Sequence, residues 1–362
     1  MKRWSSHRLL LLLLCILIAA IPLIAARGQS GPASRAAAPT DVPKSLRDLA
    51  AGRGILIGTA VEPLPVRADP DYAPLLTREF NLLTTENVLK MGPLRPDITT
   101  YYFEEADFLV DFAESNGMKV RGHTLVWHNQ LPEWMTDRTY TTSEMTWIVN
   151  DHITTVVERY RGRIWAWDVV NEAVLDDGSL RPNVFLQTMG PDYIEKAFEW
   201  ARAADPDALL FYNDFGAEAL NAKSDAIYAM VKDFVERGVP IDGVGLQMHV
   251  DVNSPPNPAD VASNIMRLSA LGLQVQITEM DVRTSGDPSE AERQAQIYAA
   301  MLEICLEAPA CTAFETWGFT DKYTWLGTQT APLLFDPLYD PKPAFFALLD
   351  VLNRAADQSP LP

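Results

Sequence analysis

Two glutamates occupy similar places in the chain, each near the end of a short apolar run. Glu172 lies in WAWDVVNEA (165–173), and Glu279 lies in ITEMD (277–281). Two carboxyl groups at one site can cleave a glycosidic bond, because one protonates the departing oxygen while the other attacks the sugar or activates water. Asp168 precedes Glu172 by four residues, so strand alternation places both on one face. We expect Asn171 and Glu172 to reach the site and Asp168 to be a hydrogen-bonding group inside the fold.

Other polar and aromatic side chains follow the neighbouring apolar runs in the same way. They are Glu86, Asn87, Lys90, His123, Trp127, His128, Asn213, Asp214, Gln247, His249, Asp281, Trp317, Asp321 and Trp325. Amides and histidines bind hydroxyl groups, and indole rings stack on the apolar faces of sugars. A buried His or Gln can also simply complete a core hydrogen bond. Their recurrence on strand after strand favours a carbohydrate site.

A divalent metal is the competing use of the same carboxylates and histidines. The chain has no HExxH motif, and its acidic residues stand singly beside amide or tryptophan neighbours. We therefore expect no metal and no cofactor, and a metal-dependent barrel enzyme remains an alternative hypothesis.

Eight short apolar segments must position these residues. The expected strands are 54–61, 80–87, 119–127, 164–172, 209–214, 243–250, 274–281 and 312–319, and helical patterns between them cover 103–117, 143–162, 191–206, 224–238 and 289–308. Strict alternation predicts an α/β fold, a single-domain (β/α)8 TIM barrel, because parallel neighbours need helical crossovers. A doubly wound open sheet is the alternative, but no strand is followed by a GxGxxG turn. The active face of a barrel is the C-terminal end of its strands, where the polar residues fall.

The N-terminus indicates an exported protein. Lys2, Arg3 and Arg8 precede an apolar run over 9–26, so we expect residues 1–26 to be a signal peptide and the protein to be secreted. An uncleaved membrane anchor is the alternative, because the run is long enough to cross a bilayer. Residues 27–43 are expected to form a flexible linker, 44–356 the catalytic barrel and 357–362 a C-terminal tail.

The net charge limits which partners the protein can bind, and the cysteine positions indicate a disulfide. The net charge of −18 becomes −21 without residues 1–26, which argues against nucleic acid as a partner. We expect a monomer. Cys15 lies in the signal segment, while Cys305 and Cys311 are close in sequence, and a local disulfide is favoured over two buried thiols in an exported protein.

Taken together, these motifs resemble those of the family 10 glycoside hydrolases, the endo-β-1,4-xylanases. The matching segments are TTENVLKM (84–91), GHTLVWHNQLPEW (122–134), WDVVNEA (167–173), YND (212–214), GVGLQMH (243–249), ITEMD (277–281), WGFTDKYTW (317–325) and PLLFDPLYDPKPAF (332–345). They occur in the family's order, so the resemblance covers almost all of the chain after the signal segment.

The resemblance implies a retaining endo-1,4-β-xylanase that acts on xylan and xylooligosaccharides. Glu172 would be the acid/base and Glu279 the nucleophile, with carboxyl groups about 5 to 5.5 Å apart. His249, backed by Asp281, would orient Glu279, and Asn171 would bind the 2-hydroxyl of the attacked sugar. The set contacting sugar on the non-reducing side of the cut would be Glu86, Asn87, Lys90, His123, Trp127, Gln247, Trp317 and Trp325. Cys305 and Cys311 match the family's short-range disulfide.

Some positions depart from the family pattern. Met91, Gly92, Phe215 and Met280 replace residues that are more usual there, which affects fine sugar contacts and leaves the catalytic pair intact. The alternative from another functional class is a non-catalytic, cell-tethered xylan-binding barrel, and the presence of both glutamates weighs against it.

Overall fold

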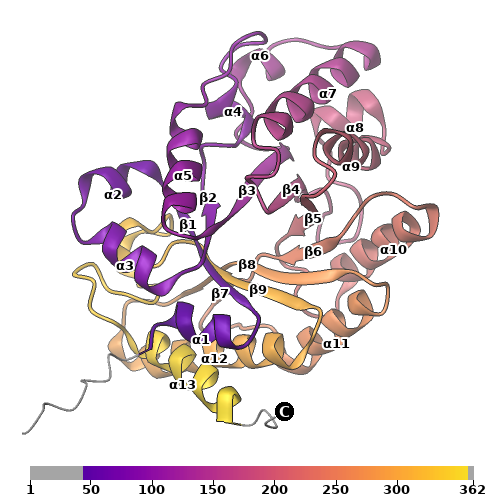
Figure 1. Cartoon of the computed structure of the whole chain (residues 1–362). Coiled ribbons are helices and arrows are strands. Elements are labelled where there is room, and N and C mark those ends of the chain that lie inside the picture. Colours follow the sequence, from indigo (N-terminus) through magenta and orange to yellow (C-terminus); the bar gives the residue numbers. More distant parts are fainter. Residues whose placement is uncertain (1–43, 358–362) are drawn as a thin grey trace, which may run out of the picture. The chain divides into compact units, whose positions relative to one another are not determined.

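Eight parallel strands form a closed ring at the centre of the protein (Figure 1). The computed structural model describes residues 44–357. The ring consists of β1 (Leu56–Val61), β2 (Leu82–Thr85), β3 (Lys119–Trp127), β4 (Ala166–Asn171), β5 (Leu209–Asp214), β6 (Gly243–Leu246), β8 (Gln274–Arg283) and β9 (Cys311–Thr316). Neighbours pair in chain order, and the β6–β8 and β1–β9 pairs complete the closure. The (β/α)8 barrel predicted from the sequence is confirmed.

The expected sixth strand is divided in two. β6 stops at Leu246, and β7 (His249–Asp251) pairs separately with β8. Between them, Met248 has a φ of 67°, a left-handed conformation that ends regular pairing. β2, β4 and β9 are also shorter than predicted at the active face, so Glu86, Glu172 and Trp317 lie just beyond their ends, whereas β8 extends further than predicted, to Arg283.

Helices surround the ring. They are α1 (Leu46–Gly52), α2 (Pro63–Ala68), α3 (Tyr72–Glu79), α4 (Met91–Leu94), α5 (Glu104–Ser115), α6 (Glu133–Thr136), α7 (Thr142–Arg159), α8 (Val184–Met189), α9 (Tyr193–Ala204), α10 (Ala222–Arg237), α11 (Pro258–Ser269), α12 (Ala291–Glu307) and α13 (Pro343–Asp357), with 3-10 turns η1 (Pro288–Glu290), η2 (Asp321–Tyr323) and η3 (Thr328–Thr330). The five predicted helical stretches correspond to α5, α7, α9, α10 and α12. A capping box at Thr141 and Glu144 begins α7, because the two side chains satisfy otherwise unpaired N–H groups.

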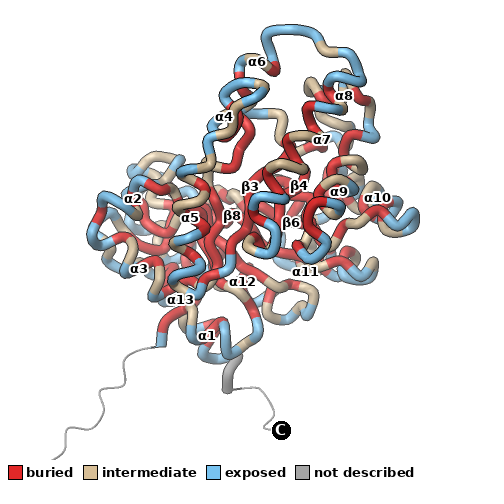
Figure 2. The backbone as a smooth tube through the Cα atoms, turned by 45° about the horizontal axis from the view of Figure 1, so that its top comes forward, coloured by how far each residue is buried: buried red, intermediate tan, exposed pale blue. Residues whose placement is uncertain are grey.

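Burial follows the barrel plan. Figure 2 shows red, buried strands at the centre and helices whose outward faces are blue and exposed. The apolar face of each helix packs on the strands, so most of the hydrophobic core lies between the ring and the helices. The strands are thereby held rigidly, and their C-terminal ends can present side chains at fixed positions.

A disulfide lies in the C-terminal part of the barrel. Cys305 in α12 and Cys311 in β9 form the predicted disulfide, with Cα atoms 5.2 Å apart. The expected signal segment 1–26, the linker 27–43 and residues 358–362 of the tail lie outside the described residues, while α13 extends to Asp357, the first residue of that tail. Within residues 44–357, no helix is both long enough and apolar enough to span a membrane.

Candidate active site

A cleft of about 530 Å³ lies at the C-terminal ends of the barrel strands. Its lining residues are Glu86, Asn87, Lys90, His123, Trp127, Asn129, Gln130, Asn171, Glu172, Phe215, Gln247, His249, Glu279, Trp317 and Trp325. The structure therefore gathers the site residues proposed from the sequence, with Asp281 behind His249 instead of on the surface of the cleft. Asn129, Gln130 and Phe215 are additional lining residues.

Glu279 lines the cleft but is only 4% exposed. It lies in β8, where pairing with β9 shifts register between Ile277 and Met280. Such a shift changes the direction of a side chain relative to regular alternation. Oε1 of Glu279 accepts a hydrogen bond from Nδ2 of Asn213 at 2.7 Å, and Oε2 lies 3.2 Å from Nε2 of His249. Donors from two other strands therefore hold both carboxylate oxygens.

The charge on Glu279 follows from these neighbours. Burial raises the pKa of Glu279, but the hydrogen bond from His249 and the nearby His123 and His249 rings outweigh burial and bring the pKa below its ordinary value. Burial lowers the pKa of His249, yet the carboxylate of Asp281, 2.9 Å from Nδ1, raises it well above the ordinary value. Asp281 also accepts a hydrogen bond from Nε1 of Trp325 at 2.8 Å. Glu279 is thus a carboxylate at neutral pH, facing a protonated imidazole.

Glu172 is the first residue beyond β4 and has a φ of 58°, which is uncommon for a residue other than glycine. Its N–H donates to the carbonyl of Asn213 at 2.9 Å, and its carbonyl accepts from Nε of Arg181 at 2.8 Å, so the backbone is fixed in this conformation. The carboxyl group accepts hydrogen bonds from Nε1 of Trp127 at 2.8 Å and Nε2 of Gln247 at 3.1 Å. The side chain is 13% exposed and lines the cleft.

Three amides connect the two glutamates. Nδ2 of Asn213 donates to Oδ1 of Asn171 at 2.9 Å as well as to Glu279. Nε2 of Gln247 donates to the same Asn171 oxygen at 3.2 Å and to Glu172. Nδ2 of Asn171 completes the connection with a 3.2 Å hydrogen bond to Glu172. The amides hold both carboxyl groups in one frame, and the separation of about 5 to 5.5 Å stays a prediction.

Asn213 is the member of this frame to which the sequence assigns no role. Thr278 donates to its Oδ1 at 2.8 Å. A β-carbon at Gly245 would overlap that oxygen and lie 2.9 Å from Cγ2 of Thr278, so the glycine leaves room for the amide. The motif YND at a strand end is a signal for a polar site residue. Its partner Glu279 is 66 residues away, and nothing local to the motif identifies it.

Buried charged side chains lie beneath the cleft, in the interior of the barrel. Nε of Arg121 donates to Oδ2 of Asp168 at 3.1 Å, and Nη2 donates to Oδ1. Both side chains are almost completely inaccessible to solvent. Asp168 is therefore a structural hydrogen-bonding group, as predicted. Pairing of β4 with β5 shifts register between Asp168 and Val170, so regular alternation is interrupted between Asp168 and Glu172.

This group also bears on metal binding. Ligand atoms of His123, Asp168 and Glu279 lie within 4.8 Å of one another. Nδ1 of His123 lies 2.9 Å from Asp168 and 3.9 Å from Glu279, so it already forms a contact with one carboxylate. The guanidinium of Arg121 occupies the other side of Asp168 and would repel a cation. The arrangement favours a hydrogen-bonded support for Glu279 over a metal site.

Lys90 and three tryptophans dominate another side of the cleft. Nζ of Lys90 donates to Oδ1 of Asn87 at 2.7 Å and lies 4.8 Å from the ring centre of Trp127 and 5.7 Å from that of Trp317. Burial lowers the pKa of Lys90, and neighbouring carboxylates oppose this. Trp325 is 57% exposed, so its ring is accessible from solvent. Stacking surfaces beside hydroxyl-binding groups are the arrangement expected around a sugar chain.

Most of the residues that depart from the family pattern do not line the cleft. Met91 and Met280 are buried, and a β-carbon at Gly92 would overlap the carbonyl oxygen of Gln130. Only Phe215 among the departing residues lines the cleft. Any effect on sugar contacts should therefore come mainly from Phe215.

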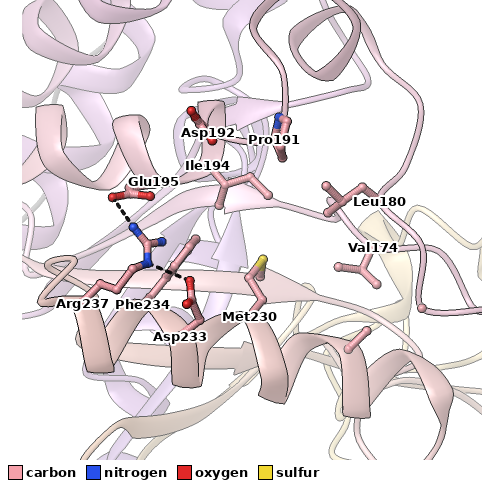
Figure 3. Close-up of a pocket in the computed structure, with 12 residues that line it drawn as sticks. Val174, Leu180, Pro191, Asp192, Ile194, Glu195, Met230, Asp233, Phe234 and Arg237 are labelled. Carbon is pink, nitrogen blue, oxygen red and sulfur yellow. Dashed lines mark hydrogen bonds and ion pairs between the residues drawn. The ribbon is translucent and has the colours of Figure 1, made fainter.

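A separate hollow, with a volume of about 380 Å³, lies between the loop 174–180 and helices α9 and α10. Figure 3 shows the side chains that line it. Nη1 of Arg237 donates to Glu195 at 2.8 Å and its Nε to Asp233 at 2.9 Å, so these charges compensate one another. Met230 and Phe234 contribute apolar surface. The hollow shares no lining residue with the cleft, and we place the chemistry in the cleft.

Comparison with known proteins agrees with this geometry. The model of glycosyl hydrolase family 10 matches residues 45–351. Endo-1,4-beta-xylanase B of Thermotoga neapolitana is 47% identical over 294 residues, which cover 78% of this chain and 84% of that protein. Endo-1,4-beta-xylanase A of Thermoanaerobacterium saccharolyticum is 40% identical over 83% of this chain, but the match spans only 27% of that longer protein.

Solved structures show the same likeness. Native xylanase 10B from Thermotoga maritima superposes with a TM-score of 0.85 at 47% identity, covering 87% of this chain and 100% of that one. Xylanase 10B from Thermotoga petrophila RKU-1, solved with xylobiose, superposes with a TM-score of 0.84 at 46% identity, covering 86% of this chain and 98% of that one.

Proposed function

The chain belongs to glycosyl hydrolase family 10, and from that premise we propose that Glu172 and Glu279 carry out its chemistry. The protein is an endo-1,4-β-xylanase that hydrolyses internal β-1,4 xylosidic bonds with retention of configuration. The observation that supports the assignment of roles is the contrast between two carboxyl groups in one cleft. Glu279 is buried and held by donors, whereas Glu172 is more open and lies outside its strand.

The first step is attack on the sugar. A carboxylate oxygen of Glu279 forms a bond to the anomeric carbon, and the bond from that carbon to the bridging oxygen breaks. Glu172 gives its proton to the departing oxygen, which leaves as a hydroxyl group. The product is a glycosyl ester of Glu279 together with a shortened xylan chain. His249 and Asn213 keep the attacking carboxylate in position through the hydrogen bonds described above.

The second step reverses these roles. Glu172, now a carboxylate, takes a proton from water, whose oxygen attacks the same carbon. The ester bond breaks, Glu279 is regenerated as a carboxylate, and Glu172 is protonated again. We assign Asn171 to the 2-hydroxyl of the sugar at the cut, since it lies between the two glutamates. The set around Lys90 and the tryptophans would bind the sugars on the non-reducing side.

Export and association also belong to this proposal. The signal-like residues 1–26 support a secreted enzyme acting on extracellular xylan. We also propose that the working unit is a monomer.

The test is hydrolysis of soluble xylan followed by reducing-sugar release and by NMR of the first product. The enzyme should release β-configured ends, with full activity in excess chelator. Glu279→Gln should bind xylan without releasing sugar. Binding by the wild type without any product would support the non-catalytic alternative, and complete loss of activity with chelator would revive the metal hypothesis.

A further inference from the structure

Two of the tryptophans that line the cleft lie at the ends of one loop, residues 317–325, which follows β9. Trp317 is buried, at 7% exposed, whereas Trp325 is 57% exposed. Burial therefore does not fix the ring of Trp325. Its indole N–H donates to Asp281 at 2.8 Å, which restrains one edge of the ring. The rest of the restraint must come from the loop that carries this tryptophan.

A carboxylate from a distant part of the chain holds the middle of this loop. Asp69 directly follows α2, and its Oδ2 accepts hydrogen bonds from Nζ of Lys322 at 2.6 Å and from the hydroxyl of Tyr323 at 2.8 Å. Oδ1 of Asp69 accepts from the N–H of Asp71 at 3.2 Å, so both carboxylate oxygens are engaged. Lys322 and Tyr323 form the end of η2 and stand shortly before Trp325 in the chain.

A third donor from another segment reaches the same oxygen. The hydroxyl of Tyr339 donates to Oδ2 of Asp69 at 2.5 Å. The rings of Tyr323 and Tyr72 meet edge to face with centroids 5.7 Å apart, which restricts the ring of Tyr323. Hydrogen bonds from Lys322 and Tyr339 hold the pKa of Asp69 well below its ordinary value, so Asp69 is a carboxylate at neutral pH.

We call Asp69, Lys322, Tyr323 and Tyr339 the Asp69 cluster. It joins the segment after α2 to the loop after β9, which lie side by side in Figure 1. Asp69 is 7% exposed and does not line the cleft, so it cannot touch a sugar there. Several charge-assisted hydrogen bonds that converge on one buried carboxylate restrain a loop more firmly than a single exposed ion pair does.

We propose that Asp69 is a positioning residue for sugar binding, which fixes the loop 317–325 and thereby the ring of Trp325 in the cleft. The inference rests on the proposed function, because it requires a sugar that stacks on Trp325. A ring that is held in place before the sugar arrives loses less conformational freedom on binding, so it contributes more to affinity. Without the cluster, affinity for the sugar falls while Glu172 and Glu279 keep their hydrogen bonds.

The first test is Asp69→Asn, which keeps the size of the side chain and removes its charge. Asp107→Asn is a matched control. Oδ1 of Asp107 accepts hydrogen bonds from Nε of Arg159 and from the hydroxyl of Tyr160, both at 2.9 Å, and Asp107 does not line the cleft. The values of kcat and KM are measured on linear xylotetraose, and thermal unfolding is measured for each variant.

Asp69→Asn should raise KM by about three- to tenfold and leave kcat within about twofold of the wild type, because a stacking contact contributes to binding in the ground state and the transition state alike. Asp107→Asn should change neither value. A lower Tm for Asp69→Asn with an unchanged KM would mean that Asp69 only stabilises the fold, and it would overturn the proposal.

A double-mutant cycle tests whether Asp69 acts through Trp325. Trp325→Ala alone should raise KM by about tenfold, and adding Asp69→Asn should change KM by less than about twofold more. Effects that multiply in the double variant would show that Asp69 acts elsewhere, against the proposal. An unchanged KM in Trp325→Ala would refute the sugar contact of Trp325 and this inference with it. A wild type without activity on linear xylan would instead refute the proposed function.

Tyr339→Phe is a milder change to the same cluster. It removes one hydroxyl group and keeps the ring, whose centroid lies 6.4 Å from that of Phe319. KM should rise by about two- to threefold, the size of one lost hydrogen bond, and Trp325→Ala should abolish the difference. If Asp69→Asn does not fold, an unchanged KM in Tyr339→Phe is sufficient to overturn the proposal.

Discussion

Glu279 and Glu172 share one cleft but have different supports. Glu279 lies within a strand, is almost completely buried, and contacts donors from β5 and β7. Glu172 lies beyond a strand end in a left-handed conformation, and its partners are the indole of Trp127 and the amides of Gln247 and Asn171. A protonated imidazole and a neutral amide contact the carboxyl group of Glu279, whereas the hydrogen-bond donors to Glu172 are all neutral.

The difference indicates how one fold separates two chemically identical side chains. A nucleophile must stay ionised, which the imidazole of His249 and its partner Asp281 favour. An acid/base group must change protonation state twice in each cycle, so permanent pairing with a cation would hinder it. Neutral donors position Glu172 without fixing its charge. Substitutions at Glu279, Glu172 and His249, from the largest expected effect to the smallest, test this contrast, and a last one at Glu315 tests the buried group beneath the cleft.

Glu279→Gln should have the largest effect. It keeps the size of the side chain and removes the attacking carboxylate, so activity should fall by at least about 10⁴-fold on xylan and on aryl xylobiosides alike. Activity is measured by sugar or phenol release, with thermal unfolding as a control for folding. Residual activity on activated aryl substrates that matched the wild type would contradict the assignment.

Glu172→Ala should affect substrates unequally, depending on how good their leaving group is. Rates on xylan should fall by about 10² to 10⁴-fold, because the leaving oxygen needs a proton. With a good leaving group, glycosylation stays fast and the ester accumulates. Azide should then accelerate turnover and yield a β-azide product, detected by NMR. An α-azide product would reverse the two roles.

His249→Asn should have a smaller effect on rate and a distinct effect on pH dependence. The hydrogen bond from His249 lowers the pKa of Glu279, so its loss raises that pKa. Because Glu279 must be ionised, the acid limb of the kcat/KM profile should move to higher pH. Asp281→Asn should shift it in the same direction by less, since the imidazole remains. A profile with unchanged acid limb would show that His249 does not act on Glu279.

Glu315 is a fully buried residue of β9, with Oε1 3.9 Å from Nη1 of Arg121. Glu315→Gln should change stability with little effect on the catalytic pair. Burial raises the pKa of Glu315 to about 8, against an ordinary value of 4.5, while Arg121 and Thr84 oppose this. The unfolded chain releases this proton at lower pH than the folded chain, so the wild type loses stability as pH rises from 4.5 to about 8.

Because glutamine does not ionise, the variant lacks this loss of stability. The difference in Tm between the variant and the wild type, measured by calorimetry, should therefore favour the variant more at pH 9 than at pH 4. Glu303→Gln, at a side chain 47% exposed on α12, is the matched control and should show no such difference. A difference in Tm that is the same at both pH values would contradict the raised pKa of the buried Glu315.

The sequence predicts the barrel and its rim well because both depend on local patterns. Apolar runs alternate with helical periods, and polar residues such as Glu172 and Glu279 follow the strands. The supports of the site are not local. Arg121 reads as an interruption of an apolar strand, and its partners Asp168 and Gln276 are 47 and 155 residues away.

Departures from regular strand geometry are likewise invisible in a pattern of alternation. The register shift after Asp168, the break at Met248 and the left-handed Glu172 each depend on contacts with other strands. Sequence motifs therefore indicate the two glutamates to which we assign the reaction, and the structure shows the different contacts that surround each of them.

The most direct test of the assignment is to trap the covalent intermediate. A 2-deoxy-2-fluoro xylobioside with a good leaving group is incubated with the wild-type enzyme, and the labelled protein is digested and sequenced by mass spectrometry. We predict a single glycosyl label on the peptide that contains Glu279. A label on Glu172, or stoichiometric hydrolysis with inverted configuration and no label, would contradict the account.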